Sequence, residues 1–219
     1  MKAVVQVCGL CAGFFGCVSA AVSLQVWSWK RTSDDGSVIL TSDLFENLWM
    51  SCAEDSTGSY SCWYFPSLFA LPGYIQVCRA LIIASIVLGT FGLIFTLIGM
   101  ECSKIGGENY LVKGRLAVLG GVFFILEGVC TMIAVSWYAS NIIQEFYNPL
   151  YDGIKFELGE GLYIGWCSAT LALIGGCCLL CVCGKDSNSD KVRVTAHSPS
   201  ALSRISRKPS MQHRLSSYI

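Results

Sequence analysis

The sequence predicts an all-α transmembrane four-helix bundle, left-handed and up-down, with a small extracellular antiparallel β-sheet of about five strands. Hydrophobic residues make up 53% of the 219 residues, and charged residues only 14%. Four windows hold a single charge, Glu127; they are residues 3–29, 80–100, 116–144 and 161–184. Each has the roughly 20 residues that a helix needs to cross about 30 Å of hydrocarbon. Membrane and water segments therefore alternate along the chain.

The first window must be distinguished from a secretory signal peptide. It follows Lys2, and Val18-Ser19-Ala20 imitates a small-residue cleavage site. The apolar run from Ala3 to Leu24 is nevertheless longer than the usual signal core of roughly 7 to 15 residues. We therefore expect a helix that is retained in the mature protein.

Segment boundaries and orientation follow from hydropathy and basic residues. We expect spans at 7–25, 79–100, 116–141 and 161–183, joined by a first outer loop at 26–78, an inner loop at 101–115 and a second outer loop at 142–160. Eleven of the fifteen Lys and Arg residues lie at 1–6, in the inner loop or in the tail at 184–219. Because basic residues stay on the cytosolic side, both termini are predicted to be cytosolic.

The first outer loop is too long for a plain connector and should fold. Strand-forming residues dominate 25–33, 37–42, 44–54 and 60–65, and Asp34-Asp35-Gly36 and Asp55-Ser56-Thr57-Gly58 have turn chemistry between them. A short helix or turn should begin at Phe65-Pro66 and end near Pro72-Gly73. The second outer loop is expected to extend the third helix and to add one strand.

Cysteines fall into two groups. Cys52 and Cys62 lie on the last two predicted strands, across a turn and on the oxidising side, so a disulfide should hold that small hairpin together. The other eleven lie in or beside the spans, where Cys is mostly a small apolar residue. Cys102, Cys181 and Cys183 are also candidates for S-palmitoylation, and both interpretations stay open.

The first outer loop also carries a recognisable signature. Trp29, Asn47-Leu48-Trp49, Cys52 and Cys62 resemble the claudin pattern of Trp, then Gly/Asn-Leu-Trp-x2-Cys-x8-10-Cys. Further stretches, such as Phe65-Pro66-Ser67 and Ser136-Trp137-Tyr138, are similar to the channel-forming claudin fifteen and claudin ten branch. The resemblance implies a tight-junction protein that pairs with itself and with other claudins, within one membrane and across to the next cell. It implies structural roles for Trp29 and Trp49, as aromatic anchors at the membrane face, and for Arg79.

The balance of charge in the first outer loop favours cations. The segment 30–79 contains six acidic residues and only three basic ones. The acids are Asp34, Asp35, Asp43, Glu46, Glu54 and Asp55. Carboxylates lining a narrow passage replace part of a cation's hydration, so permeating monovalent cations are the expected partner. Asp55 matches the family's charge-selectivity position, although an ordinary solvated turn acid is the alternative. Glu54 should point to the opposite sheet face, and Tyr64 stands where near relatives often carry a second acid.

Assembly contacts are implied by the same resemblance. Leu68 matches an apolar knob, and Phe146, Tyr147 and Leu158 match the pocket that receives it on a neighbouring molecule; packing of Leu68 onto its own sheet is the alternative. Cross-cell contacts are implied for Ile39, Leu40, Asn148, Pro149 and Leu150. Exposed apolar residues beside a polar surface are typical of an interaction patch.

Glu127 departs from the apolar residue expected in the third span. A charge there is costly and usually marks pairing or function. Three states stay open for it: a protonated carboxyl, a hydrogen bond to a Ser or Thr on a neighbouring helix, such as Ser85, Thr90 or Thr170, or burial in a contact between protomers. We assign it no part in conduction.

The polar tail at 184–219 is expected to be disordered and to lie near membrane lipid, because it is basic and lacks apolar periodicity. It ends in Ser217, Tyr218 and Ile219, a pattern that PDZ scaffold domains bind by strand addition. Claudins commonly end in Tyr-Val for that purpose.

Parts of the sequence are also compatible with two other functions. The chain has CxxC pairs at Cys8/Cys11 and Cys178/Cys181, and some small membrane oxidoreductases use such pairs to transfer electrons. Both pairs are predicted to lie toward the cytosolic side, and no outer cysteine pair besides Cys52 and Cys62 could pass electrons to them. We expect no enzyme activity, cofactor, metal site or nucleic-acid partner. The nearer rival is an auxiliary channel subunit or adhesion protein of the wider claudin-like superfamily.

Overall fold

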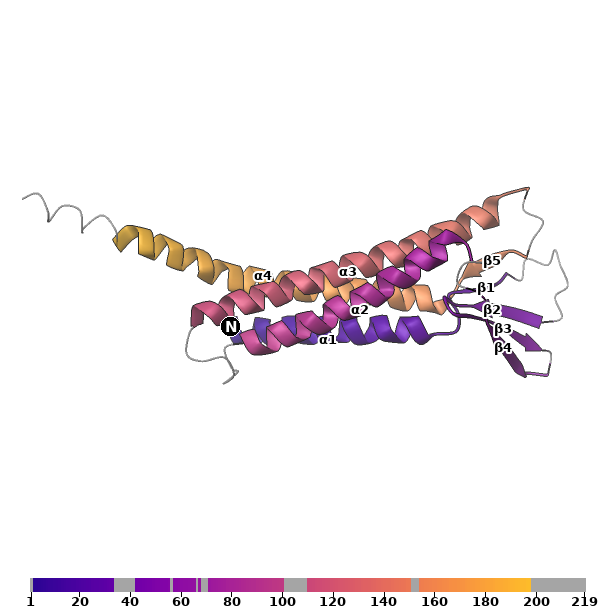
Figure 1. Ribbon diagram of the computed structural model, residues 1–219, viewed down its shortest axis with the longest axis horizontal. Helices are drawn as coiled ribbons and strands as arrows, with labels where there is room; N and C mark the ends of the chain where they lie inside the picture. Colours follow the sequence, from indigo (N-terminus) through magenta and orange to yellow (C-terminus); the bar gives the residue numbers. More distant parts are fainter. Residues whose placement is uncertain are drawn as a thin grey trace, which may run out of the picture.

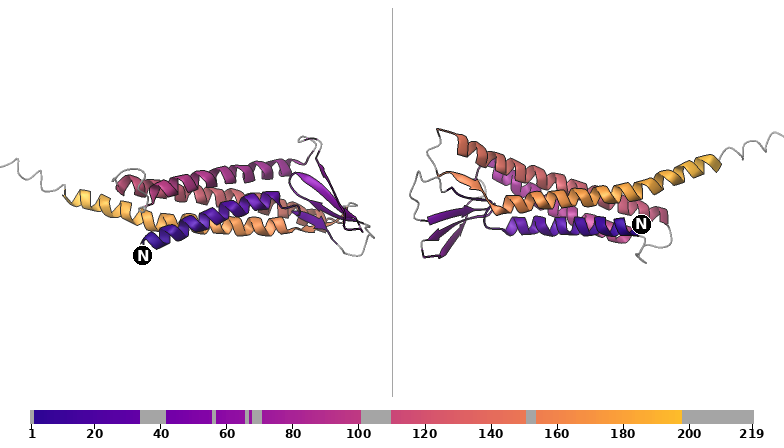
Figure 2. Two further views of the ribbon diagram at one scale, coloured as in Figure 1. Left: turned by 90° about the horizontal axis from the view of Figure 1, so that it is seen from below. Right: turned by 180° about the vertical axis from the view of Figure 1, so that it is seen from behind.

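Four long helices form a bundle that carries a small sheet at one end (Figure 1). The computed structural model describes residues 2–33, 42–55, 57–65, 67, 71–100, 110–150 and 154–197. The helices are α1 (Lys2–Gln25), α2 (Gly73–Gly99), α3 (Tyr110–Tyr147) and α4 (Glu160–His197). Each contains a segment long and apolar enough to cross a membrane. α1 packs against α2 and α4, and α3 packs against the same two helices, so the bundle closes as a ring (Figure 2).

The helices extend further than the predicted spans. α2 begins at Gly73, directly after Pro72, and not at residue 79. α3 continues past the span expected at 116–141, and α4 continues to His197 into the tail that we expected to be disordered. A fall in hydropathy marks the end of the membrane-spanning segment, but the helix itself can continue until a residue such as Pro ends it. The first Pro after the start of α4 is Pro199. Residues 198–219, including the predicted PDZ ligand, lie outside the described residues.

The sheet is antiparallel and has five strands, as predicted. They are β1 (Lys30–Thr32), β2 (Ser42–Glu46), β3 (Met50–Asp55), β4 (Tyr60–Tyr64) and β5 (Phe156–Leu158), in the order β4-β3-β2-β1-β5. Two predicted strands were wrong in extent. The strand predicted at 25–33 occupies only 30–32. The segment 44–54, predicted as one strand, contains the end of β2 and nearly all of β3. The strand predicted at 37–42 falls mostly on residues that are not described.

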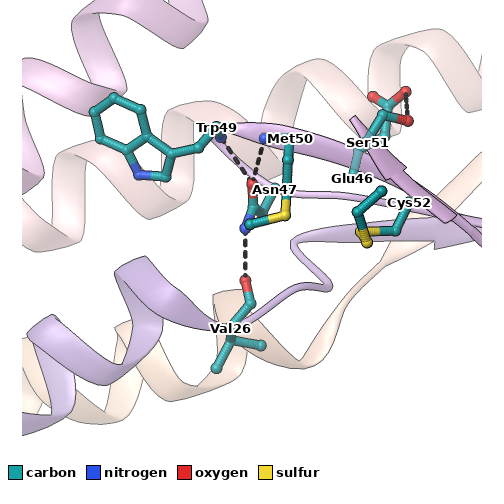
Figure 3. The surroundings of a disulfide bond; sticks show 8 residues. Val26, Glu46, Asn47, Trp49, Met50, Ser51 and Cys52 are labelled. Carbon is teal, nitrogen blue, oxygen red and sulfur yellow. Dashed lines mark hydrogen bonds between the residues drawn. A yellow bond between two sulfur atoms is a disulfide. The ribbon is translucent and has the colours of Figure 1, made fainter. Parts of the chain in front are cut away.

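Asn47 explains why the segment 44–54 divides (Figure 3). Its side-chain oxygen accepts hydrogen bonds from the backbone N–H groups of Trp49 and Met50, at 2.7 and 2.8 Å. Its amide nitrogen donates to the carbonyl of Val26, which follows α1, at 3.2 Å. Asn side chains that bond the backbone two residues on stabilise turns. Asn47 thus reverses the chain between β2 and β3 and ties that turn to the helix bundle.

Trp29 lies in the core between the sheet and the bundle. It is fully buried, its indole N–H donates to the carbonyl of Ser23 at 2.7 Å, and its ring packs edge to face on Tyr138 at 5.1 Å. Trp29, for which a place at the membrane face was expected, is enclosed by protein, because β1, α1, α3 and α4 converge around it. Arg79 of α2 is also buried; its Nε donates to the carbonyl of Leu48, and its guanidinium lies 4.7 Å from the Trp49 ring centre.

Glu127 is completely buried inside the bundle. The three hydroxyl groups suggested as its partners bond to backbone in their own helices: Ser85 to Ile82, Thr90 to Val87 and Thr170 to Cys167. Within the described part of the chain, neither carboxyl oxygen has a hydrogen-bond partner. Of the alternatives left open for Glu127, the hydrogen bond to a hydroxyl group is therefore not formed, because hydroxyl groups in helices can bond to the preceding turn.

Candidate functional site

The disulfide between Cys52 and Cys62 is confirmed. The two residues lie directly opposite each other on β3 and β4. The β3–β4 hairpin is the outer edge of the sheet, so it has a neighbouring strand on one side only. A covalent link between its strands limits opening of that edge. Figure 3 shows Cys52 on β3, the strand that follows the Asn47 turn.

Three acids gather at one end of the β2–β3 ladder. Asp43 lies opposite Glu54, and Ser42 lies opposite Asp55. The other end of the ladder joins the bundle, since Trp29 donates its backbone N–H to the carbonyl of Glu46 at 2.9 Å. The acids therefore occupy the end of the sheet that is remote from the helices.

The acids are divided between the two faces of the sheet. Asp43 and Glu54 share a face, because directly paired residues project to the same side, and Asp55 projects to the other. Like charges directly opposite each other are destabilising unless something offsets them. Tyr60, opposite Glu54 on β4, hydrogen-bonds to its carboxylate, which raises the pKa of the Tyr60 hydroxyl. Tyr64 projects to the face of Glu54 and is 74% exposed.

The bases of the outer segments are engaged elsewhere. Each of the four lies over an aromatic ring: Lys30 over Phe156, Arg31 over Phe45, Arg79 over Trp49 and Lys155 over Phe146. Lys30 also forms a 2.7 Å ion pair with Glu46. Lys30 and Arg79 thus hold positive charge near the helices, whereas Lys155 lies beside Ser33 at the other end of the β1–β5 ladder. Glu46, a predicted selectivity residue, is neutralised by Lys30, its neighbour on β1.

Three of the predicted assembly residues line one groove. Phe146 and Tyr147 at the end of α3 and Leu158 on β5 border a groove of about 270 Å³. Leu68, the predicted knob, lies outside the described residues, as do Ile39 and Leu40. Asn148, Pro149 and Leu150 form the turn after α3, in which the Asn148 side chain accepts the N–H of Leu150 at 3.1 Å. Leu150 is 90% exposed.

The cysteines of the helices are free thiols where they are described. Cys181 is exposed on α4, Cys102 lies outside the described residues, and the side chain of Cys183 is not described. The described residues contain no group of three His, Cys, Asp or Glu side chains placed to hold a metal ion.

Two features of the site were missed from the sequence. The Lys30–Glu46 pair and the opposition of Asp43 and Glu54 both depend on strand register, which the sequence left open. Neither pairing follows from spacing alone.

Comparison with known proteins agrees with this architecture. The model of the PMP-22/EMP/MP20/Claudin family matches residues 3–179. The chain is 47% identical over 188 residues to Claudin-15 of Bos taurus, covering 85% of this chain and 80% of that protein. It is 43% identical to human Claudin-19, covering 81% and 80%, and 37% identical to Claudin-7 of Mus musculus, covering 84% and 89%. With four spanning helices, a five-stranded sheet and the disulfide-linked signature, the chain is a multi-pass membrane protein of the claudin family.

Proposed function

We propose that this protein polymerises in tight-junction strands and forms a cation-preferring paracellular channel between cells. The sheet faces the extracellular space, and both termini are cytosolic, because most basic residues lie at the other ends of the helices. The protein acts as a structural element and catalyses no reaction. Its partners are further copies of itself, other claudins and, through Ser217–Ile219, PDZ scaffolds.

The observation that carries the proposal is the separation of charge along the sheet. Asp43, Glu54 and Asp55 lie together at the end remote from the membrane, where a passage between facing cells would run. Lys30 and Arg31 lie toward the other end, Lys30 opposite Glu46, and they are held by aromatic rings or by Glu46. An aqueous passage bordered by the remote end would therefore attract cations and exclude anions.

The size of the effect can be bounded. One carboxylate about 4 Å from a monovalent cation contributes roughly 1 kcal/mol in water and about 4 kcal/mol at an effective dielectric constant near 20. Desolvation of the ion offsets part of this. A net preference of about 1 to 2 kcal/mol corresponds to roughly five- to thirty-fold discrimination. Asp55 and Glu54 each contribute, and Tyr64 offers only a hydroxyl where a further carboxylate would strengthen the field.

Lateral assembly uses the groove bordered by Phe146, Tyr147 and Leu158 as the receiver for Leu68 of a neighbouring molecule. The groove is open and largely apolar, which suits a leucine side chain. The turn at Asn148–Leu150, with Ile39 and Leu40, contacts the facing cell. The high exposure of Leu150 supports that role, since a large apolar side chain in water favours burial in an interface.

Expression in fibroblasts that lack tight-junction strands tests the assembly. Freeze-fracture electron microscopy is expected to show continuous strands at cell contacts, and Tyr147→Ala, which removes a ring from the groove, should fragment them. Trp137→Ala, which removes an exposed ring of α3 that does not line this groove, is the control and should leave the strands continuous. An epithelial monolayer expressing the protein should conduct sodium in preference to chloride. Unaltered conductance together with changed gating of a co-expressed channel would instead indicate an auxiliary subunit.

A further inference from the structure

A second groove lies where α1 meets the sheet, and the assembly proposed above does not use it. Its volume is about 730 Å³, within the range of small-molecule sites. Val18, Ala21 and Val22 of α1 form one end, and the residues at the other end come from the chain after α1, from the sheet and from the start of α4. The groove thus joins the helix bundle to the extramembrane domain.

The apolar end of this groove faces lipid. Val18 and Val22 are 43% and 47% exposed on a helix that is apolar enough to span the membrane. The span ends at Gln25, which also lines the groove. The groove therefore runs from the hydrocarbon layer to the level of the lipid headgroups.

The opposite end is aromatic and charged. Trp27 and Tyr60 meet edge to face with ring centres 5.9 Å apart, and each ring is about half exposed. Phe45 forms a third aromatic wall, with Arg31 5.7 Å above its ring centre. Glu160, the first residue of α4, supplies a carboxylate on the same lining.

These groups match one chemistry. Aromatic faces bind quaternary ammonium groups, and a carboxylate beside them adds attraction for a cation. A guanidinium binds phosphate through paired hydrogen bonds. A sterol has neither a phosphate nor an ammonium group, and an anionic lipid lacks the ammonium group. Neither lipid would therefore engage the guanidinium, the aromatic rings and the carboxylate together.

We propose that this groove binds a phosphatidylcholine molecule from the leaflet on the sheet side of the membrane. Arg31 contacts the phosphate, and the trimethylammonium group lies among Trp27, Tyr60 and Glu160. One acyl chain lies along Val18 and Val22. The proposal rests on the membrane-spanning helices and is independent of ion selectivity.

Photocrosslinking in vesicles tests the assignment. The full chain is reconstituted in phosphatidylethanolamine vesicles that contain a trace of phosphatidylcholine with a diazirine near the glycerol end of one acyl chain. Mass spectrometry then measures labelling of the peptides that contain Val18–Trp27. We expect excess unlabelled phosphatidylcholine to reduce this labelling at least five-fold, and equal amounts of phosphatidylglycerol or cholesterol to leave it nearly unchanged.

Variants define the site. Arg31→Gln and Trp27→Leu should each lower the labelling at least three-fold, and Glu160→Gln, an exposed change with little effect on folding, about two-fold. Trp137→Leu removes an exposed tryptophan from α3, outside the groove, and should have no effect. Formation of the Cys52–Cys62 disulfide in each variant verifies folding. Equal labelling in all folded variants, or displacement by cholesterol or phosphatidylglycerol as strong as by phosphatidylcholine, would overturn the proposal.

Discussion

The carboxyl group of Glu127 on α3 lies directly against Gly89 on α2. A Cβ atom at Gly89 would stand 2.6 Å from the carboxyl carbon, closer than such atoms approach. Helices α2 and α3 therefore approach each other closely at this point, because Gly89 has no side chain and leaves room for the carboxyl group of Glu127. Both carboxyl oxygens are buried, and among the described residues neither is hydrogen-bonded.

The contact predicts that Gly89→Ala destabilises the bundle, by roughly 1 to 3 kcal/mol, because the added methyl group overpacks the interface. The double variant Gly89→Ala/Glu127→Ala should recover much of this loss, since the shorter side chain makes room. Gly114→Ala is the matched control: it is also in a helix but has open space around it, so it should be neutral or slightly stabilising. Thermal unfolding in detergent measures all three, and equal effects at the two glycines would contradict the packing described.

A second prediction concerns the acid itself. Glu127→Met keeps a similar volume and removes a buried polar group that has no partner in the described chain, a group that costs about 1 to 3 kcal/mol. Unfolding of this variant is expected at an equal or higher temperature than in the wild type. Glu127→Gln, which keeps a buried polar group, should gain less. A marked loss of stability in Glu127→Met would mean that the carboxyl group makes a stabilising bond.

Asn47 is predicted to be the most sensitive polar residue of the turn between β2 and β3. Asn47→Ala removes three hydrogen bonds in a buried site, each worth about 0.5 to 1.5 kcal/mol, so a loss of about 2 to 4 kcal/mol is expected. Asn148→Ala removes one comparable bond in an exposed turn and should cost less than about 1 kcal/mol. Unfolding and surface expression measure both. Similar losses for the two would show that the link to Val26 is unimportant.

The disulfide is predicted to contribute about 2 to 3 kcal/mol, the range for a short closed loop. The double variant Cys52→Ser/Cys62→Ser should expose the sheet to protease digestion in sealed vesicles while the helices stay protected. Cys8→Ser/Cys11→Ser alters two exposed thiols of α1 that form no disulfide and should leave the digestion rate unchanged. Unaltered protection of the sheet after loss of Cys52 and Cys62 would sink this prediction.

Much of the fold could be predicted because the signals are local. Apolar windows that hold one charge among them located the four helices, and two cysteines across a turn located the disulfide. The boundary between β2 and β3 was missed because strand-forming residues continue on both sides of Asn47, and only the hydrogen bonds of its side chain show that the chain turns there. The continuation of α4 was missed because a change in hydropathy marks the membrane surface and does not stop a helix.

The candidate site was less predictable because it depends on register. Acidic excess in the first outer loop was plain from the sequence, but its concentration at the remote end of the sheet required Asp43 to pair with Glu54. The loss of Glu46 from the selectivity set required Lys30 to lie opposite it. Asp43 and Glu54 are 11 positions apart, and Lys30 and Glu46 are 16 positions apart. Only the strand pairing brings the members of each pair together.

The central claim is that carboxylates at the remote end of the sheet select cations. Dilution potentials across an epithelial monolayer that lacks the endogenous protein test it, with the wild type, Asp55→Asn and the triple variant Asp43→Asn/Glu54→Gln/Asp55→Asn. The wild type should prefer sodium to chloride, Asp55→Asn should reduce the preference several-fold, and the triple variant should abolish it. Glu157→Gln, on β5 near the helices, should match the wild type. A triple variant that keeps the wild-type sodium preference while still forming strands would contradict the account.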